Sequence, residues 1–289
     1  MVRHCLLALM MVWMTAAQAI SVVDDSGHTV TLAQPARRII SLTPHLTEDL
    51  FAIGAGHLLV AATDYSDYPA AAKAIPRVGG YDNLDLERIR LYKPDLILAW
   101  SGGNSPRQLE QVAKLGLPVY YDDPKTLADV RHSLTRLGEL TGRAQAAQHL
   151  NATLLKREQA LSTRFGGKPV VKVFYQVWDK PLMTINGEQV MSDIMQRCSG
   201  RNVFAALKAR APTVDEEAVL AAAPDLIVTS GDGEAKTSWL THWQRYPGVP
   251  AVKYAQLKVL PPDVLSRMGP RLVEGAEALC AAIDGARRP

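Results

Sequence analysis

Aromatic residues follow several of the predicted strands. Tyr65 and Tyr68 lie in TDYSDYP, and Tyr81 follows two glycines in VGGYDNLD. Trp100 and Trp178 end the apolar runs LILAW and VFYQVW. Rings at strand ends with glycine beside them are suited to line a pocket for a large, flat and partly apolar molecule. For any single ring, half-buried packing is an equally good interpretation.

Charged residues complete this set of candidate functional residues. Arg267, in LSRMGPR, lies just before the last predicted helix. Glu87 and Glu217 each lie early in a predicted helix, where a carboxylate also favours the helix dipole. Two separated carboxylates are suited to dock on a partner with paired basic pockets, because bidentate arginine contacts set the register.

Catalysis finds little support in the sequence. It contains no G-x-S-x-G, H-E-x-x-H, C-x-x-C or P-loop motif, so no catalytic residue is assigned and an enzyme is disfavoured. The 7 histidines are scattered, with no pair at helical spacing. His45 lies at a strand end and could ligate a metal centre, although a place at a helix start is as good an interpretation. No metal site is predicted.

The elements that carry these residues occur twice along the chain. Apolar runs alternate with helix-period stretches, which predicts α/β units with mostly parallel sheets. The segments LDLERIRLYKPDLILAW and TVDEEAVLAAAPDLIVT match at Glu87 and Glu217 and at Asp95 and Asp225. More weakly, LTEDLFAIGAG matches VMSDIMQRCSG. We therefore predict an α/β fold with two Rossmann-like lobes of similar plan.

One long helix is predicted between the lobes. Residues 143–165 lack proline and glycine and are rich in Ala, Leu, Gln, Lys and Arg. Such a helix is a rod of roughly 35 Å, unlike a flexible linker. The predicted units are an N-terminal lobe at 20–141, the bridging helix at 142–166 and a C-terminal lobe at 167–289. Strand-end loops of both lobes should face the cleft between them.

The first residues have the pattern of a secretory signal peptide. Arg3 precedes a short apolar run, and Ala17-Gln18-Ala19 forms a small-x-small cleavage site, so 1–19 is predicted to be removed. An apolar run of this length is shorter than the roughly 20 residues that span a bilayer. The formal charge of +3, without a basic stripe, does not favour nucleic acid as a partner.

Cys198 and Cys280 remain after this processing. Cysteines of exported proteins usually pair, and a bridge here would fasten the last helix to the second lobe. Two buried free thiols are the alternative.

The mature chain resembles the periplasmic binding proteins whose two lobes are bridged by one helix, the class III members that serve ABC importers of vitamin B12, haem and iron siderophores. The likeness is greatest to the vitamin B12-binding members. Its most specific segments are SLTPHLTEDLFAIGAG, YSDYP, LERIRLYKPDLILAWSGGN and QLEQVAKLGLPVYY, together with the two cysteines.

This resemblance implies cobalamin as a transported ligand between the lobes, with no cofactor. Pocket rings of the family fall on Tyr65, Tyr81 and Trp100, and its pocket arginine falls on Arg267. Tyr81 is a tyrosine at a position where a vitamin B12-binding member of the family has tryptophan. A second-lobe tryptophan of the family is replaced near Ala211, and Trp178 is the candidate that compensates for it.

The resemblance also implies a partner and a disulfide. The family's docking glutamates fall on Glu87 and Glu217, which indicates a BtuCD-like membrane ABC permease, and its disulfide falls on Cys198 and Cys280. A periplasmic monomer is expected. Haem or a ferric siderophore is the alternative ligand, with Tyr65 or His45 as the iron ligand for haem.

Overall fold

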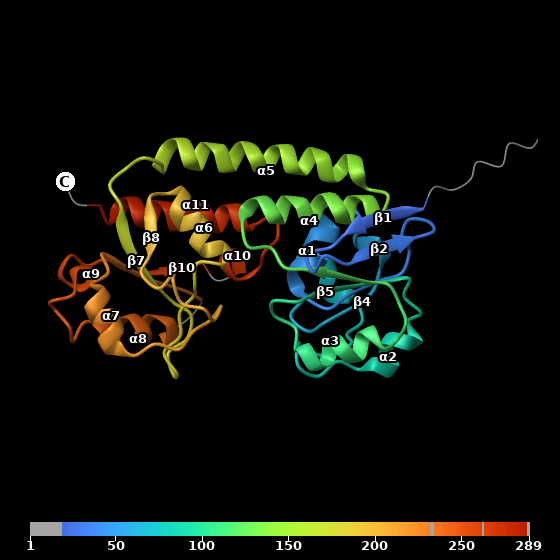
Figure 1. Cartoon of the computed structure of the whole chain (residues 1–289), viewed down its shortest axis with the longest axis horizontal. Helices are drawn as coiled ribbons and strands as arrows, with labels where there is room; N and C mark the ends of the chain where they lie inside the picture. The colour runs from blue at the N-terminus through green and yellow to red at the C-terminus, as the bar shows by residue number, and fades with distance from the viewer. Residues whose placement is uncertain (1–18, 232–233, 262, 288–289) are drawn as a thin grey trace, which may run out of the picture.

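The computed structural model describes residues 19–231, 234–261 and 263–287 of the chain. Within them, two α/β lobes lie next to each other beneath one long helix, as predicted (Figure 1). The predicted signal peptide, 1–19, lies outside the described residues except for its last residue. None of the helices in the described part is long and apolar enough to cross a membrane.

The first lobe is built on four parallel strands in the order β4-β3-β5-β6. Four consecutive residues of β5 are buried, because helices cover both faces of such a sheet. The strands are Ile39–Ser41 (β3), Leu59–Ala62 (β4), Leu96–Trp100 (β5) and Val119–Asp122 (β6), and the helices are Pro44–Ala52 (α1), Leu86–Leu91 (α2), Pro106–Ala113 (α3) and Leu127–Leu140 (α4), with 3-10 turns at Gly56–Leu58 and Ala70–Ala74.

The second lobe repeats this plan, with its parallel strands in the order β8-β7-β9-β10. The strands are Val171–Gln176 (β7), Gly200–Asn202 (β8), Leu226–Ser230 (β9) and Leu257–Leu260 (β10). The helices are Val190–Arg197 (α6), Glu216–Ala222 (α7), Glu234–Trp243 (α8), Pro250–Lys253 (α9), Asp263–Ser266 (α10) and Leu272–Gly285 (α11).

The predicted duplication is confirmed by matching side-chain contacts. Asp95 precedes β5 and accepts hydrogen bonds from the backbone N–H groups of Arg37 and Arg38, at 2.8 and 3.0 Å. Asp225 precedes β9 and accepts one from the backbone N–H of Lys172, at 2.9 Å. In both lobes the carboxylate thus ties the start of one central strand to the start of its neighbour.

The chain enters the first lobe through a β-hairpin. Its strands Ile20–Val23 (β1) and Thr29–Leu32 (β2) are antiparallel. The Asp24 carboxylate closes the turn by accepting from the backbone N–H groups of Ser26 and His28, both at 2.9 Å. Asp24 also accepts from the backbone of Tyr121, at 3.1 Å, so the hairpin is fixed to the end of the first sheet.

Helix α5 (Ala144–Phe165) bridges the lobes and packs on both of them (Figure 1). Its buried side includes Leu154, Leu161 and Phe165, which belong to one apolar core that contains residues of α4, α6 and α11. Glu158 on the same side is 3% exposed and pairs with Arg131 at 2.9 Å. The sequence predicts a rod, and the structure shows that this rod is also part of a shared core.

Candidate ligand-binding site between the lobes

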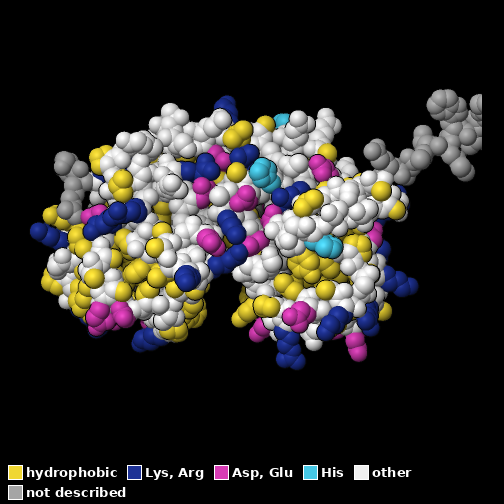
Figure 2. Space-filling model, viewed as in Figure 1, with side chains coloured by type: hydrophobic (Ala, Val, Ile, Leu, Met, Phe, Trp, Pro, Cys, Tyr) yellow, Lys and Arg dark blue, Asp and Glu magenta, His cyan; other side chains and the backbone are white. Residues whose placement is uncertain are grey.

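A cavity of about 430 Å³ lies where the carboxyl ends of the first sheet face the second lobe. Ligands of open α/β sheets bind at this edge. Figure 2 shows a hollow between the lower halves of the lobes, with basic and acidic side chains gathered where the lobes meet above it. The cavity is lined by Leu42, Thr43, Pro44, His45, Thr63, Asp64, Tyr65, Tyr81, Trp100, Gly103, Asn104, Ser266 and Arg267.

Tyr65 presents an exposed ring from the loop after β4. The side chain is 76% exposed, and its backbone φ of 63° lies in the left-handed region, which costs a non-glycine residue free energy. The next residue fixes the loop, because the Ser66 carbonyl accepts from Arg77 at 2.9 Å. Strain of this kind is common where the surrounding structure presents a side chain to a ligand.

Tyr81 lines the same cavity from a tight turn ahead of α2. It is 65% exposed. Gly79 has a φ of 98°, and a Cβ there would lie 2.2 Å from the Asn83 carbonyl oxygen. The Asn83 side chain accepts from the Gly80 backbone N–H at 2.7 Å. The two glycines therefore let the turn close tightly enough to present Tyr81.

Trp100 forms the inner wall at the end of β5. Its backbone N–H donates to the Asn104 side chain at 2.8 Å, and Asn104 in turn donates to the Leu42 carbonyl at 2.9 Å. A Cβ on Gly103 would lie 2.0 Å from the Trp100 ring. The ring therefore lies directly against a backbone that only glycine allows.

His45 contacts Trp100 edge to face, with the ring centroids 5.4 Å apart. Its Nε2 lies 3.0 Å from Asp122 Oδ2, and its Nδ1 lies 2.8 Å from Thr43 Oγ1. Both ring nitrogens are therefore engaged, which argues against the interpretation of His45 as a metal ligand. In the part of the chain that the structure describes, no three His, Cys, Asp or Glu side chains gather as a metal site.

Arg267 is a residue of the second lobe that lines the cavity. Its guanidinium pairs with Glu48 and with Asp67, each at 2.8 Å, and both acids belong to the first lobe. Burial lowers the pKa of Arg267, but the hydrogen bonds and charges of these two carboxylates raise it by more. Arg267 is therefore a cation that reaches across the gap between the lobes.

Trp178 does not line this cavity. It follows β7, is 53% exposed, and contacts Trp239 of α8 edge to face at 5.5 Å. Thr43 and Asn104, which do line the cavity, were not singled out from the sequence. Their position in the loops that follow β3 and β5 is the signal that could have found them.

Glu87 and Glu217 occupy matching positions on the two lobes. Each lies two residues after an aspartate that caps its helix, since Asp85 accepts from the Arg88 backbone at 2.9 Å and Asp215 from the Ala218 backbone at 2.7 Å. Both glutamates are exposed. Neighbouring Glu216 is instead bound by His242 and Tyr246.

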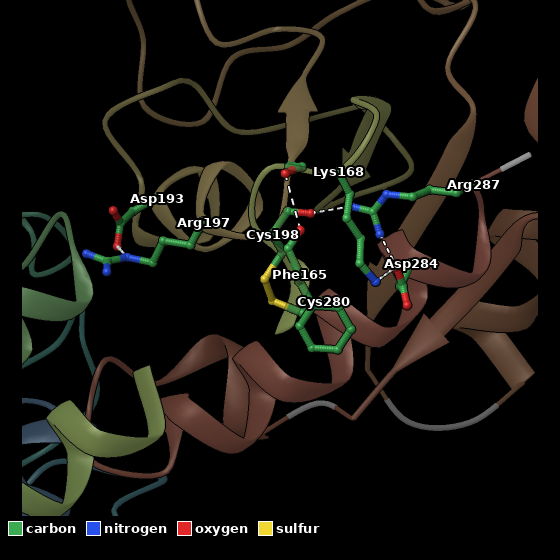
Figure 3. Close-up of a disulfide and its surroundings, with 9 residues drawn as sticks. Phe165, Lys168, Asp193, Arg197, Cys198, Cys280, Asp284 and Arg287 are labelled. Carbon is green, nitrogen blue, oxygen red and sulfur yellow. Dashed lines mark hydrogen bonds and ion pairs between the residues drawn. A yellow bond between two sulfur atoms is a disulfide. The ribbon is translucent and has the colours of Figure 1, made fainter. Parts of the chain in front are cut away.

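Cys198 and Cys280 form a disulfide, which confirms the predicted pairing (Figure 3). It joins the end of α6 to α11, and both cysteines are buried. Around it, Arg287 donates to the Cys198 carbonyl at 2.6 Å, and Lys168 pairs with Asp284 at 2.7 Å.

The duplicated lobes, the bridging helix and the cleft define a class of binding proteins. The profile described as "Periplasmic binding protein" matches residues 39–264, and the chain belongs to this family. Its members are binding proteins rather than enzymes.

Two similar proteins are both named as vitamin B12-binding proteins. The chain is 36% identical over 247 residues to a vitamin B12-binding protein of Photorhabdus laumondii, covering 86% of this chain and 88% of the relative. The crystal structure of the periplasmic vitamin B12 binding protein BtuF of Vibrio cholerae matches with a TM-score of 0.82 and 34% identity, over 88% of this chain and 99% of that one.

A more distant structure shares the fold. A periplasmic heme binding protein from Pseudomonas aeruginosa matches with a TM-score of 0.75 at 24% identity, over 88% of this chain and 95% of that one.

Proposed function

We propose that this protein binds cobalamin or a related corrinoid between its lobes and delivers it to an ABC importer. The observation that carries the proposal is the convergence of Tyr65, Tyr81 and Trp100 with Arg267 on one cavity. Exposed rings offer apolar area to a macrocycle at a small cost in side-chain entropy. The names of the similar proteins support the same ligand.

A corrinoid with its nucleotide tail is larger than a drug-sized molecule, for which about 300–1,000 Å³ suffices. The cavity of about 430 Å³ therefore receives one part of it. The remainder extends along the carboxyl edge of the second sheet, where Trp178 follows β7. Trp178 is in this proposal the second-lobe ring that contacts the ligand.

The partner is a membrane ABC permease of the BtuCD type, and the protein works as a periplasmic monomer. Glu87 and Glu217 contact paired basic pockets of that permease, one from each lobe. Their exposure and matching positions support this role. Residues 1–19 act as the signal peptide, and the mature chain comprises the lobes at 20–141 and 167–289 with the bridging helix at 142–166.

Absorbance titrations with cyanocobalamin and with hemin test the ligand. We expect saturable binding of cyanocobalamin at one site. We expect hemin to give no Soret band that depends on Tyr65. Both ring nitrogens of His45 are engaged, so a tyrosine phenol of the cavity would have to ligate the iron, and Tyr65→Phe tests the first of these phenols. If hemin gives a Soret band that depends on Tyr65 and cyanocobalamin does not bind, the ligand is haem rather than a corrinoid.

A further inference from the structure

Glu48 is a buried carboxylate of the first lobe that is bound by two arginines of the second. It lies on α1 and is 3% exposed. Arg271 donates from Nε and Nη2 to its two oxygens, at 2.9 and 2.8 Å, and Arg267 donates from Nη1 at 2.8 Å. Removing one partner from such a buried group is costly, because a charge then stays unpaired. We call Glu48, Arg267 and Arg271 together the lobe clamp.

The same arginines bind the loop that carries Tyr65. Arg267 pairs with Asp67 at 2.8 Å. The guanidinium carbon of Arg271 lies 3.6 Å from the ring centroid of Tyr68, in a cation–π contact. Since Tyr65 itself has a strained backbone, the contacts on Asp67 and Tyr68 help to keep this loop in place.

Glu48 and Arg271 do not line the ligand cavity. They line a separate cavity of about 280 Å³ together with Phe51, Ala52, Tyr68, Pro69 and Pro270. Of the residues around the ligand cavity, Glu48 and Arg271 contact Arg267 and the Tyr65 loop through the side chains described above, so these contacts connect them to the ligand.

We propose that Glu48 and Arg271 are positioning residues for ligand binding: they fix Arg267 and the Tyr65 loop at the spacing that the ligand requires. This inference rests on the proposed function. Without Arg271, Glu48 keeps one partner, the Tyr68 ring loses its cation, and Arg267 and Tyr65 can move apart. The ligand should then dissociate faster, while the association rate changes little.

A double-mutant cycle separates positioning from general stability. Cyanocobalamin affinity is measured for the mature chain, Arg271→Gln, Tyr65→Ala and the double variant. We expect Arg271→Gln to weaken binding about tenfold in the native chain and less than about threefold in Tyr65→Ala, because part of its effect acts through that ring. Arg157→Gln is the matched control, since it removes the ion pair of Arg157 with Glu277 between α5 and α11.

Two results would overturn the proposal. One is an affinity of Arg271→Gln within about twofold of the native chain, and the other is an equal loss in both backgrounds, which is the additivity expected of residues that do not interact. Should Arg271→Gln not fold, Arg271→Lys takes its place, because lysine keeps the charge but lacks the two-bond fork.

Failure of the proposed function has a different signature. If the native chain binds no corrinoid, hydrogen exchange of the ligand-free protein still tests the lobe clamp. Arg271→Gln should then speed exchange in residues 63–69, where the Ser66 N–H donates to the Thr63 carbonyl, and Arg157→Gln should not. Equal exchange in the native chain and Arg271→Gln would overturn the positioning role.

Discussion

Arg210 and Asp123 form a two-bond ion pair that joins the lobes beside Trp100. Arg210 Nη1 donates to Asp123 Oδ1 at 2.6 Å, and Nη2 donates to Oδ2. A Cβ on Gly102 would lie 2.4 Å from Arg210 Nη1 and 2.7 Å from the Trp100 indole nitrogen. The Arg210–Asp123 pair and the lobe clamp at Glu48 are thus two ion-pair contacts between the lobes. The first lies beside Trp100 of the cavity, and the second includes Arg267 of the cavity.

Arg210→Gln should therefore weaken ligand binding. The Asp123 carboxylate would lose its two-bond partner, and the second lobe would lose its contact beside Trp100. We expect a loss of about 1.5 to 3 kcal/mol in binding free energy, the size of a hydrogen bond to a charged group. Calorimetric titration at two salt concentrations checks this, with the exposed Arg107→Gln as control. Equal affinity in the native chain and Arg210→Gln would show that the pair has no part in binding.

Gly103→Ala should disturb Trp100. A Cβ at this position would lie 2.0 Å from the ring, so the indole must leave its present orientation. We expect a change in tryptophan fluorescence and at least about a tenfold loss of affinity, equivalent to about 1.4 kcal/mol. Gly248→Ala is the control, because nothing lies within 4 Å of a Cβ there. Unaltered binding by Gly103→Ala would mean that the ligand does not depend on the orientation of Trp100.

The buried carboxylate of Asp49 should make the stability of the fold depend on pH. It is fully buried at the junction of the lobes, and neither carboxylate oxygen has a hydrogen-bond partner among the described residues. Burial, and then the charges of Asp122 and Glu48, raise its pKa well above the ordinary 3.8. The folded chain thus keeps this proton at a pH where the unfolded chain releases it, and stability falls as pH rises above 3.8.

Asp49→Asn removes this penalty. The variant should be more stable than the native chain at pH 7, by about 1.4 kcal/mol for each unit of the pKa shift that lies between 3.8 and pH 7. The difference should vanish below pH 3.8, where both states of the native chain are protonated. Urea unfolding at several pH values measures it. A variant that is less stable at pH 7 would show that the Asp49 carboxylate has a stabilising contact.

Loss of the disulfide should lower stability without affecting the ligand. The bridge closes a segment with a sequence separation of 82, for which the chain-entropy estimate is about 4.5 kcal/mol. Cys198→Ser with Cys280→Ser should reduce the free energy of unfolding by about 2 to 4 kcal/mol. Neither cysteine lines the ligand cavity, so corrinoid affinity should stay the same. A loss of affinity in folded protein would connect the bridge to the site.

Glu87→Arg and Glu217→Arg should abolish delivery while leaving ligand binding intact. Each replaces an exposed carboxylate by a cation, which a basic pocket repels. Uptake of labelled cobalamin by cells, together with a titration of the purified variants, separates the two effects. Glu139→Arg, on the exposed side of α4, is the control. Normal uptake with both substitutions would place the docking surface elsewhere.

The sequence predicted the features that depend on local pattern. Asp95 and Asp225 revealed the duplication because they perform the same local task in each lobe. Tyr65, Tyr81 and Trp100 could be placed at one sheet edge because strand ends alone determine that position. The same rule does not bring Trp178 to the cavity, since the segment after β7 turns back at Met183 and the ring contacts Trp239.

The contacts between the lobes could not be predicted in this way. Glu48 and Arg271 are 223 residues apart in the chain, and Asp123 and Arg210 are 87 apart. Nothing in the local spacing of these residues indicates which charges meet, because their pairing depends on how the two lobes are placed. The shared core beneath α5 depends on the same placement.

Calorimetric titration of the mature protein with cyanocobalamin tests the central claim most directly, when it is combined with removal of the first-lobe rings. The native chain should bind one corrinoid per molecule, the variant with Tyr65, Tyr81 and Trp100 each changed to alanine should lose binding, and the exposed-ring control Tyr254→Ala should bind as the native chain does. Absence of heat with the native chain, or undiminished binding by the triple variant, would contradict the account.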